Sequence, residues 1–248
     1  GALGEILVDV RATSPGSRLP AVLLIHGFKG FKDYAFIPVT ADRLARAGFS
    51  AVTMSVSGSG VDADGDFTHL DRFAVNTYTR ELDDLHVVLR ALAAGELGVA
   101  SPTSVGVLGH SRGGGMALLL AQEAAEISAV ATWAGIGRMR RHTDQELAIW
   151  KKLGTVEVVH QRLRIAMPLD YIVAEDYLAQ ADTISNLPAA VRSLGRPWLQ
   201  VHGTGDRTVE VREAEELASE ADPRLIRRLI LDGADHTFGC RHPWAGMT

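Results

Sequence analysis

Cysteine is almost absent from this chain of 248 residues, in which Cys240 is the only one. A single cysteine cannot form a disulfide within the chain, and it cannot build a cysteine-based zinc or iron–sulfur site. No apolar run approaches the roughly 18 residues of a membrane span, and no signal-peptide pattern opens the chain. We therefore expect no membrane partner, and we take the cytoplasm as the default location unless a signal peptide has been removed.

An excess of charge of one sign is also lacking. The net charge of −5 provides no basic surface field that would hold nucleic acid. The hydrophobic fraction of 46% and the charged fraction of 22% are those of a folded soluble protein and exclude a disordered chain. At about 150 residues per domain, the length allows one large domain or two small ones.

Glycine, by contrast, is plentiful, with 25 residues. Several glycines follow short apolar runs, as at Gly27, Gly109 and Gly203. Runs that are apolar on both faces are typical of parallel strands covered by helices, and helical patterns of period 3.6 lie between them. This alternation predicts an α/β fold with a mostly parallel sheet and helices on both faces. The predicted strands are residues 5–11, 21–25, 50–55, 105–108, 129–133, 198–201 and 225–231.

Residues 135–196 break this alternation, because they contain no convincing buried strand. They show helical patterns at 145–153, 156–165 and 175–180 instead. A connection of this length is often functional, so we expect a helical cap or lid over the strand ends. The alternative is a solvated helical hairpin away from any site. The cap and the α/β core, residues 1–134 and 197–248, then form one domain.

The segment Gly109-His110-Ser111-Arg112-Gly113 matches the G-x-S-x-G pattern of a nucleophile elbow. It lies between a predicted buried strand and an Ala-rich helical pattern, which is the context that the motif needs. Such a sharp turn holds the Ser111 hydroxyl above the sheet, at the positive end of the following helix. Gly109 and Gly113 are required because a Cβ at either position would clash. The alternative is a Gly-Ser turn that only caps a helix.

A serine nucleophile needs a base, and the base needs an acid that orients it. Asp206 follows the sixth predicted strand, and His236 follows the seventh. The chain order Ser, Asp, His is that of α/β-hydrolases. Asp232 and Asp235 are closer to His236 in the sequence, but we interpret both as turn residues.

The second predicted strand leads into His26-Gly27-Phe28-Lys29-Gly30. The backbone N–H groups of Phe28 and Arg112 are predicted to form an oxyanion hole, where each donor stabilises the transition state by about 3 kcal/mol. We expect the Phe28 ring to line the acyl pocket, with a core position as the alternative. Lys29 is a candidate substrate contact or an ordinary surface charge.

Within the predicted cap, four side chains are candidates for lining the substrate pocket. Packing of helices against the core explains them equally well. They are Trp150, His160, Met167 and Tyr171.

Three histidines, His26, His110 and His202, lie at predicted strand ends. No H-x₃-H or H-E-x-x-H spacing connects them, so we predict structural roles and not a metal site. The sequence therefore predicts neither a metal nor another cofactor.

The motifs H-G-F-K-G-F-K-D, G-H-S-R-G-G, H-G-T-x-D-x-x-V and D-H-T-F together resemble the α/β-hydrolase superfamily. Within it, the chain resembles the dienelactone-hydrolase-like and S9-peptidase-like bacterial serine esterases, which include feruloyl (cinnamoyl) esterases. The resemblance covers nearly the whole chain. It implies Ser111 as nucleophile, His236 as base, Asp206 as the acid that orients it, and Phe28 and Arg112 as oxyanion donors.

The same resemblance bears on the cap and on the reaction. In feruloyl esterases, an insertion at the position of residues 135–196 forms a small cap that shapes the pocket. Dienelactone hydrolases proper carry cysteine at the elbow, where this chain has Ser111, so lactone opening is not implied. The chain also begins one predicted strand before His26 and ends 12 residues after His236, so we expect both ends to be shorter than is usual in that group.

We expect a serine carboxylesterase that hydrolyses small or aromatic esters through an acyl-enzyme, with a small-molecule ester as its partner. A thioesterase, an acyltransferase or an S9-like peptidase would use the same triad. A catalytically silent binding module with a hydrolase fold is an alternative from a different class, and labelling with a fluorophosphonate would exclude it. The sequence leaves a homodimer open.

Overall fold

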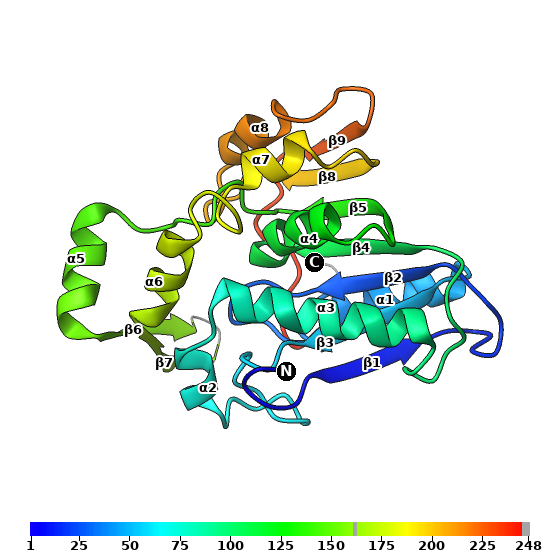
Figure 1. Ribbon diagram of the computed structural model, residues 1–248, viewed down its shortest axis with the longest axis horizontal. Helices are drawn as coiled ribbons and strands as arrows, with labels where there is room; N and C mark the ends of the chain where they lie inside the picture. The colour runs from blue at the N-terminus through cyan, green and yellow to red at the C-terminus, as the bar shows by residue number, and fades with distance from the viewer. Residues whose placement is uncertain (161–162, 245–248) are drawn as a thin grey trace.

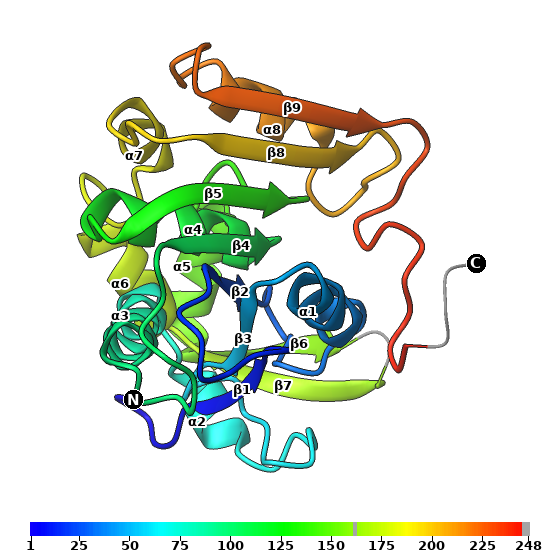
Figure 2. The ribbon, with the colours of Figure 1, turned by 90° about the vertical axis from the view of Figure 1, so that its right-hand side faces the viewer.

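Seven strands of the described chain form one sheet. The computed structural model describes residues 1–160 and 163–244. The strands are β1 (Leu7–Arg11), β2 (Ala21–Ile25), β3 (Ser50–Ser55), β4 (Val105–His110), β5 (Ile127–Trp133), β8 (Trp198–Gly203) and β9 (Ile226–Leu231). Their order is β1-β3-β2-β4-β5-β8-β9, with β1 antiparallel to β3 and the other neighbours parallel. Figure 2 shows the carboxyl ends of β4, β5, β8 and β9 at the same edge of the sheet.

Each of the predicted strands is present, and their ends agree to within two residues. The mostly parallel sheet is therefore confirmed. β3 is buried along its whole length, which explains why its sequence shows no alternation of apolar and polar residues. The register pairs Ile25 with Gly109 and His110 with Trp133, so the segments that follow β2, β4 and β5 leave the sheet side by side.

Helices cover both faces of the sheet. α1 (Ile37–Arg46) lies on one face, and α3 (Tyr78–Ala94) and α4 (Arg112–Glu123) lie on the other (Figure 2). The Thr77 side chain caps the start of α3, and Gly95 ends this helix with a left-handed φ of +76°. No helix in the described part of the chain has both the length and the apolar character needed to cross a membrane.

The segment after β5 contains strands as well as helices. It begins with α5 (Asp144–Leu153), close to the predicted helix, and continues as an antiparallel hairpin of β6 (Thr155–His160) and β7 (Ile165–Asp170). α6 (Ile172–Ala179) follows the hairpin and covers most of the last predicted helical piece. The predicted helix over 156–165 is therefore wrong, and the insertion is mixed where a helical one was expected; residues 161–162 of that prediction lie outside the described chain.

The physical reason for the hairpin is an alternation of period two. In β6, Thr155, Glu157 and Val159 are exposed, whereas the residues between them are more buried and His160 is fully so. β-Branched residues favour such a half-buried, pleated surface once a partner strand is present. That partner strand is β7, and the sequence of residues 155–160 alone does not predict its pairing with β6.

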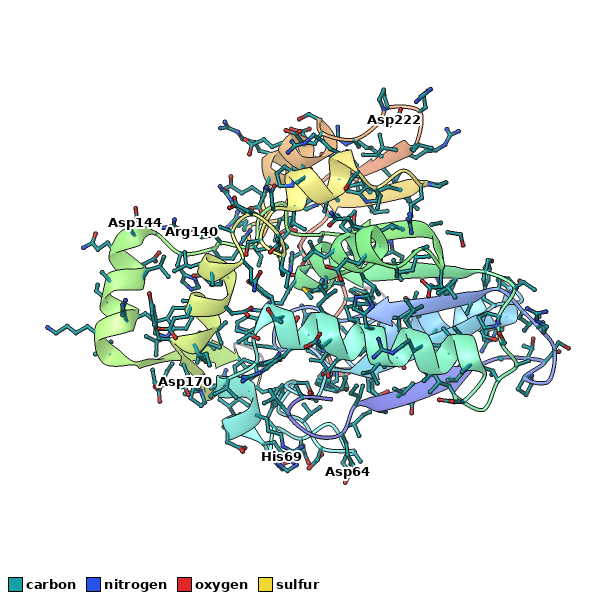
Figure 3. All side chains as sticks on the ribbon, viewed as in Figure 1. Asp64, His69, Arg140, Asp144, Asp170 and Asp222 are labelled. Carbon is teal, nitrogen blue, oxygen red and sulfur yellow. The ribbon has the colours of Figure 1, made fainter. Side chains whose placement is uncertain are left out.

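The elements from α5 to α6, which we call the cap, project from one side of the core (Figure 1). Figure 3 shows Asp144 at the start of α5 and Asp170 at the end of β7 on this side of the molecule. β7 packs against α2 (Leu70–Ala74). Asp176 of α6 accepts hydrogen bonds from the backbone N–H and the hydroxyl of Thr79, at 3.1 and 2.6 Å. The cap is therefore attached to the core through the first turn of α3.

The last part of residues 135–196 belongs to the core layer and not to the cap. α7 (Leu187–Arg192) packs against α4 and α8 (Val211–Ala218). Leu187 is completely buried in this contact layer. The crossover from β5 to β8 thus contains an ordinary covering helix in addition to the cap.

Two neighbours on α5 give a test of cap packing. Trp150 is 3% exposed and its indole N–H donates to the Leu169 carbonyl at 2.9 Å, whereas Ile149 is 52% exposed. We expect Trp150→Ala to lower the free energy of unfolding by about 3 kcal/mol and Ile149→Ala to change it by less than about 0.5 kcal/mol. Urea denaturation measures both values, and hydrogen exchange of the β6 and β7 amides shows where the loss occurs. Equal effects of the two changes would contradict this packing.

Candidate active site

Ser111 occupies a sharp turn between β4 and α4, where it adopts φ +57° and ψ −120°. A residue other than glycine in this region is strained, and such strain is found where a nucleophile is presented above a sheet. The turn is held by two hydrogen bonds: the Ser111 N–H donates to the Trp133 carbonyl at 3.0 Å, and the Gly114 N–H donates to the Ser111 carbonyl at 2.9 Å. The predicted strand–turn–helix context is therefore present.

Close backbone packing explains the glycines around Ser111. A Cβ on Gly109 would lie 2.0 Å from the Gly113 carbonyl oxygen, and a Cβ on Gly113 would lie 2.4 Å from the carbonyl oxygens of Ile25 and His26. The predicted need for glycine at both positions is confirmed. A Cβ on Gly27 would lie 2.9 Å from the Cβ of Ser111, so the loop after β2 passes directly beside the serine.

Asp206, His236 and Ser111 form a hydrogen-bonded line. His236 Nδ1 donates to Asp206 Oδ2 at 2.8 Å, which leaves Nε2 to accept from the Ser111 hydroxyl at 3.0 Å. The other carboxylate oxygen of Asp206 accepts from the backbone N–H groups of Thr208 and Val209, at 2.8 and 2.9 Å. The structure thus brings together three residues that the sequence places after three different strands.

Asp206 is held in its charged form. Burial raises the pKa of this carboxyl group, but hydrogen bonds from His202, His236 and the Val209 N–H outweigh that effect and hold the pKa well below its usual range. His202 Nε2 donates to the Val209 carbonyl at 2.8 Å and lies 3.3 Å from Asp206 Oδ2. The carboxylate is therefore charged and oriented before any substrate arrives.

The two rival acids stabilise turns, as predicted. Asp235 accepts through Oδ1 from the backbone N–H groups of Thr237 and Gly239, at 3.0 and 2.8 Å. Asp232 accepts from the Thr204 hydroxyl at 2.9 Å. Neither interaction is one that would orient the imidazole of His236.

The three histidines at strand ends have backbone partners. His110 Nε2 donates to the His236 carbonyl at 2.9 Å, and His26 Nδ1 donates to the Gly27 carbonyl at 2.8 Å. Among the described residues, no group of three or more His, Cys, Asp or Glu side chains is placed to hold a metal ion.

Phe28 and Arg112, the predicted oxyanion donors, flank Ser111 from two segments. Arg112 is the first residue of α4, where a backbone N–H has no acceptor within the helix. Phe28 follows Gly27 in the loop beside Ser111. Neither N–H donates a hydrogen bond to another residue of the described chain, so both are free to bind an oxygen.

The Arg112 side chain is buried, with 9% of its surface exposed, and its guanidinium donates to Glu81 at 3.0 Å. Burial raises the pKa of Glu81, while the Arg112 charge and the Asn76 amide act in the opposite direction. Glu81 is not among the residues predicted from the sequence. Its signal is a charged residue among the buried positions Tyr78, Leu82 and Leu85 of α3.

A cavity of about 440 Å³ borders His236. Phe28 and Lys29 line it, as predicted, together with Tyr34 and His160. The Lys29 ammonium donates to the Val159 carbonyl at 2.9 Å and so joins the loop after β2 to the cap; burial, followed by repulsion from Arg112, lowers the pKa of Lys29. Three further lining residues are not predicted to contact a substrate, although they lie within or beside the motifs that contain Asp206 and His236: Arg207, Thr208 and Thr237.

The expectation that Trp150, Met167 and Tyr171 line the pocket is not met among the described residues. Trp150 and Met167 are buried in the core, and Tyr171 packs edge-on against Trp150 at 5.8 Å. Trp150 also contacts His142 and donates to the Leu169 carbonyl, so packing within the insertion uses these side chains. Of the four cap candidates, His160 alone borders the cavity.

A second cavity of about 200 Å³ lies against α1 and is lined by apolar side chains that include Phe36, Trp133 and Trp244. Neither Ser111 nor His236 borders it. We therefore take the cavity beside His236 as the candidate substrate pocket.

A mostly parallel sheet with a serine elbow after β4, an acid after β8 and a histidine after β9 defines an α/β-hydrolase. The family model of the dienelactone hydrolase family matches residues 8–160. The chain belongs to this family. No curated protein matches the chain significantly.

Solved structures share this fold at low sequence identity. Est1E from Butyrivibrio proteoclasticus with bound ferulic acid has a TM-score of 0.73 and 17% identity, over 94% of this chain and 88% of that one. A hydrolase structure from Agrobacterium vitis S4 has a TM-score of 0.70 and 21% identity, over 93% and 85%. A monoacylglycerol lipase from Paleococcus ferrophilus has a TM-score of 0.70 and 14% identity, over 94% and 91%.

His26 provides a test of the loop that carries Phe28. Burial lowers the pKa of His26 to about 4, and the neutral ring accepts through Nε2 from the Val56 N–H at 3.3 Å. Between the unfolded-state pKa near 6.5 and the folded-state pKa of about 4, the unfolded chain binds a proton that the folded protein does not. The free energy of unfolding therefore has its full value above pH 6.5 and decreases as the pH falls to about 4. We expect the loss to reach about 3 kcal/mol and to be absent in His26→Gln. Urea unfolding across this pH range measures it, and equal pH slopes in the two proteins would contradict the assignment.

Proposed function

We propose that this protein is a serine carboxylesterase that hydrolyses small or aromatic esters through an acyl-enzyme. The observation that carries the proposal is the hydrogen-bonded line from Asp206 through His236 to Ser111, in which His236 borders the 440 Å³ cavity. An activated serine beside two free backbone N–H groups has the parts that acyl transfer needs.

In the proposed reaction, Ser111 Oγ attacks the ester carbonyl while His236 Nε2 takes the hydroxyl proton. Asp206, already charged, stabilises the imidazolium that forms. The carbonyl oxygen becomes negatively charged and is bound by the Phe28 and Arg112 N–H groups. His236 then gives the proton to the leaving alcohol. In the second half, His236 takes a proton from water, whose oxygen attacks the acyl carbon. The bond between this carbon and Ser111 Oγ then breaks, His236 returns the proton to Oγ, and the acid is released.

The walls of the cavity support an aromatic or otherwise small substrate. The rings of Phe28, Tyr34 and His160 border it, and Lys29 and Arg207 contribute the basic groups. Est1E, which shares the fold, is solved with ferulic acid bound, and methyl ferulate is therefore one of the two esters that we propose to test. The other is p-nitrophenyl acetate, which makes no demand on an aromatic acyl pocket.

We expect Ser111→Ala to reduce turnover of both esters by at least about 10⁴-fold while the fold is kept, because the nucleophile is lost. Labelling by a fluorophosphonate should disappear in the same variant. Ser219→Ala is the matched control, since Ser219 is an exposed serine at the C-cap of α8 whose hydroxyl donates to the Glu216 carbonyl. Retained turnover in Ser111→Ala would refute the nucleophile, and cleavage of thioesters or amides without oxygen esters would refute the esterase.

We expect Asp206→Asn to lower kcat/KM by about 10⁴-fold, because an amide cannot stabilise the imidazolium and disturbs the tautomer of His236. Asp232→Asn, in the turn before His236, should leave kcat/KM within about twofold. Steady-state kinetics with p-nitrophenyl acetate compare the two. A large loss of kcat/KM in Asp232→Asn together with a small loss in Asp206→Asn would show that Asp206 is not the acid that orients His236.

A further inference from the structure

The guanidinium of Arg112 lies over two aromatic rings. Its central carbon is 4.0 Å from the centroid of the Phe28 ring and 4.8 Å from that of the Tyr78 ring. The Phe28 ring also stacks on Phe73, with the centroids 5.4 Å apart and the planes inclined by 23°. A flat cation over aromatic faces is attracted by the negative face of each ring, and the attraction grows where water is excluded.

An ion pair fixes the guanidinium within this stack. Arg112 Nη1 donates to Glu81 Oε1 at 3.0 Å, and the same oxygen accepts from the Asn76 amide at 2.8 Å. The Arg112 and Glu81 side chains are only 11% and 9% exposed. A buried cation needs such a partner, and the planar fork of arginine allows pairing at its edge and stacking on its faces at the same time.

The two residues joined by this stack are the two proposed oxyanion donors. Arg112 begins α4, and Phe28 lies in the loop after β2, so their backbones belong to separate segments. That loop contains Lys29 with a left-handed φ of +62°, a conformation that a residue other than glycine keeps only when its surroundings hold it. The position of the Phe28 N–H relative to the Arg112 N–H therefore depends on contacts between side chains.

We propose that Arg112 is a positioning residue for ester hydrolysis: its guanidinium stacks on the Phe28 ring and thereby holds the Phe28 backbone N–H in the position where it donates to the oxyanion. This role rests on the proposed function and is separate from that of the Arg112 backbone N–H, which any residue at this position would supply. A displacement of one donor by about 1 Å is enough to cost up to about 100-fold in rate.

Two matched ketones separate this role from a structural one. A trifluoromethyl ketone accepts the Ser111 oxygen at its carbonyl carbon, with the hydroxyl proton passing to His236, and so places an oxyanion in the hole. The corresponding methyl ketone occupies the pocket mainly without that bond. In Arg112→Ala, we expect kcat/KM and the affinity for the trifluoromethyl ketone to fall together by about 10- to 100-fold. The affinity for the methyl ketone should change by less than about threefold.

Millimolar guanidinium chloride provides a rescue experiment. In Arg112→Ala the free ion can enter the space between the Phe28 and Tyr78 rings, and we expect part of the lost kcat/KM to return, with no such effect from equal sodium chloride. Arg112→Lys and Phe28→Leu each keep one part of the contact, and both should show the same split between the two ketones. If Arg112→Ala does not fold, these two variants test the positioning role of Arg112 in its place.

Arg224→Ala is the matched control. Arg224 is an exposed arginine paired with Asp222, which lies in the loop between α8 and β9, away from the cap (Figure 3). We expect this variant to keep kcat/KM and both affinities, with no response to guanidinium.

Equal losses for both ketones in the folded variants, or unchanged kcat/KM in all three, would refute the positioning role and leave Arg112 as a part of the core. A wild-type protein that binds no trifluoromethyl ketone and is not labelled by a fluorophosphonate would instead refute the proposed function itself.

Discussion

Three backbone segments meet at Ser111 with no space for a side chain between them, and the candidate site depends on this contact. Glycine at 113 lets α4 begin directly against the carbonyl groups at the end of β2. Gly27 lets the following loop pass so close to Ser111 that a Cβ at position 27 would clash with the Cβ of the serine. Backbone packing thus brings Ser111 and the start of the loop that carries Phe28 together, and the left-handed φ of Ser111 is the conformational cost.

Around this contact, the charged groups are buried in pairs. Asp206 is satisfied by two backbone N–H groups and two imidazoles, and it orients His236 toward Ser111. Arg112 and Glu81 form a second pair on the other side of the elbow. Electrostatic interactions are stronger away from water, and groups that are already oriented need no rearrangement when charge develops on a substrate. Both groups of charged residues are therefore oriented by their own hydrogen bonds.

The cap completes the cavity with few residues. His160 reaches the cavity from the end of β6, and the Lys29 ammonium joins the loop after β2 to the Val159 carbonyl of the same strand. Trp150 and Met167, by contrast, are buried in packing contacts. The cap is thus a wall of this cavity supported by its own packing, and loops at the sheet edge contribute other lining residues.

The amino-acid sequence alone is sufficient to predict the strands, the serine elbow and the residues of the triad. These features depend on local properties: apolar runs closed by glycine, and functional residues after strand ends that a parallel sheet brings to one edge. The hairpin of the cap is different, because residues 156–160 become a strand only through pairing with β7. The burial of Trp150 and the stack of Arg112 on Phe28 are likewise decided by tertiary structure, since they join side chains from separate segments and no spacing in the sequence encodes such a contact.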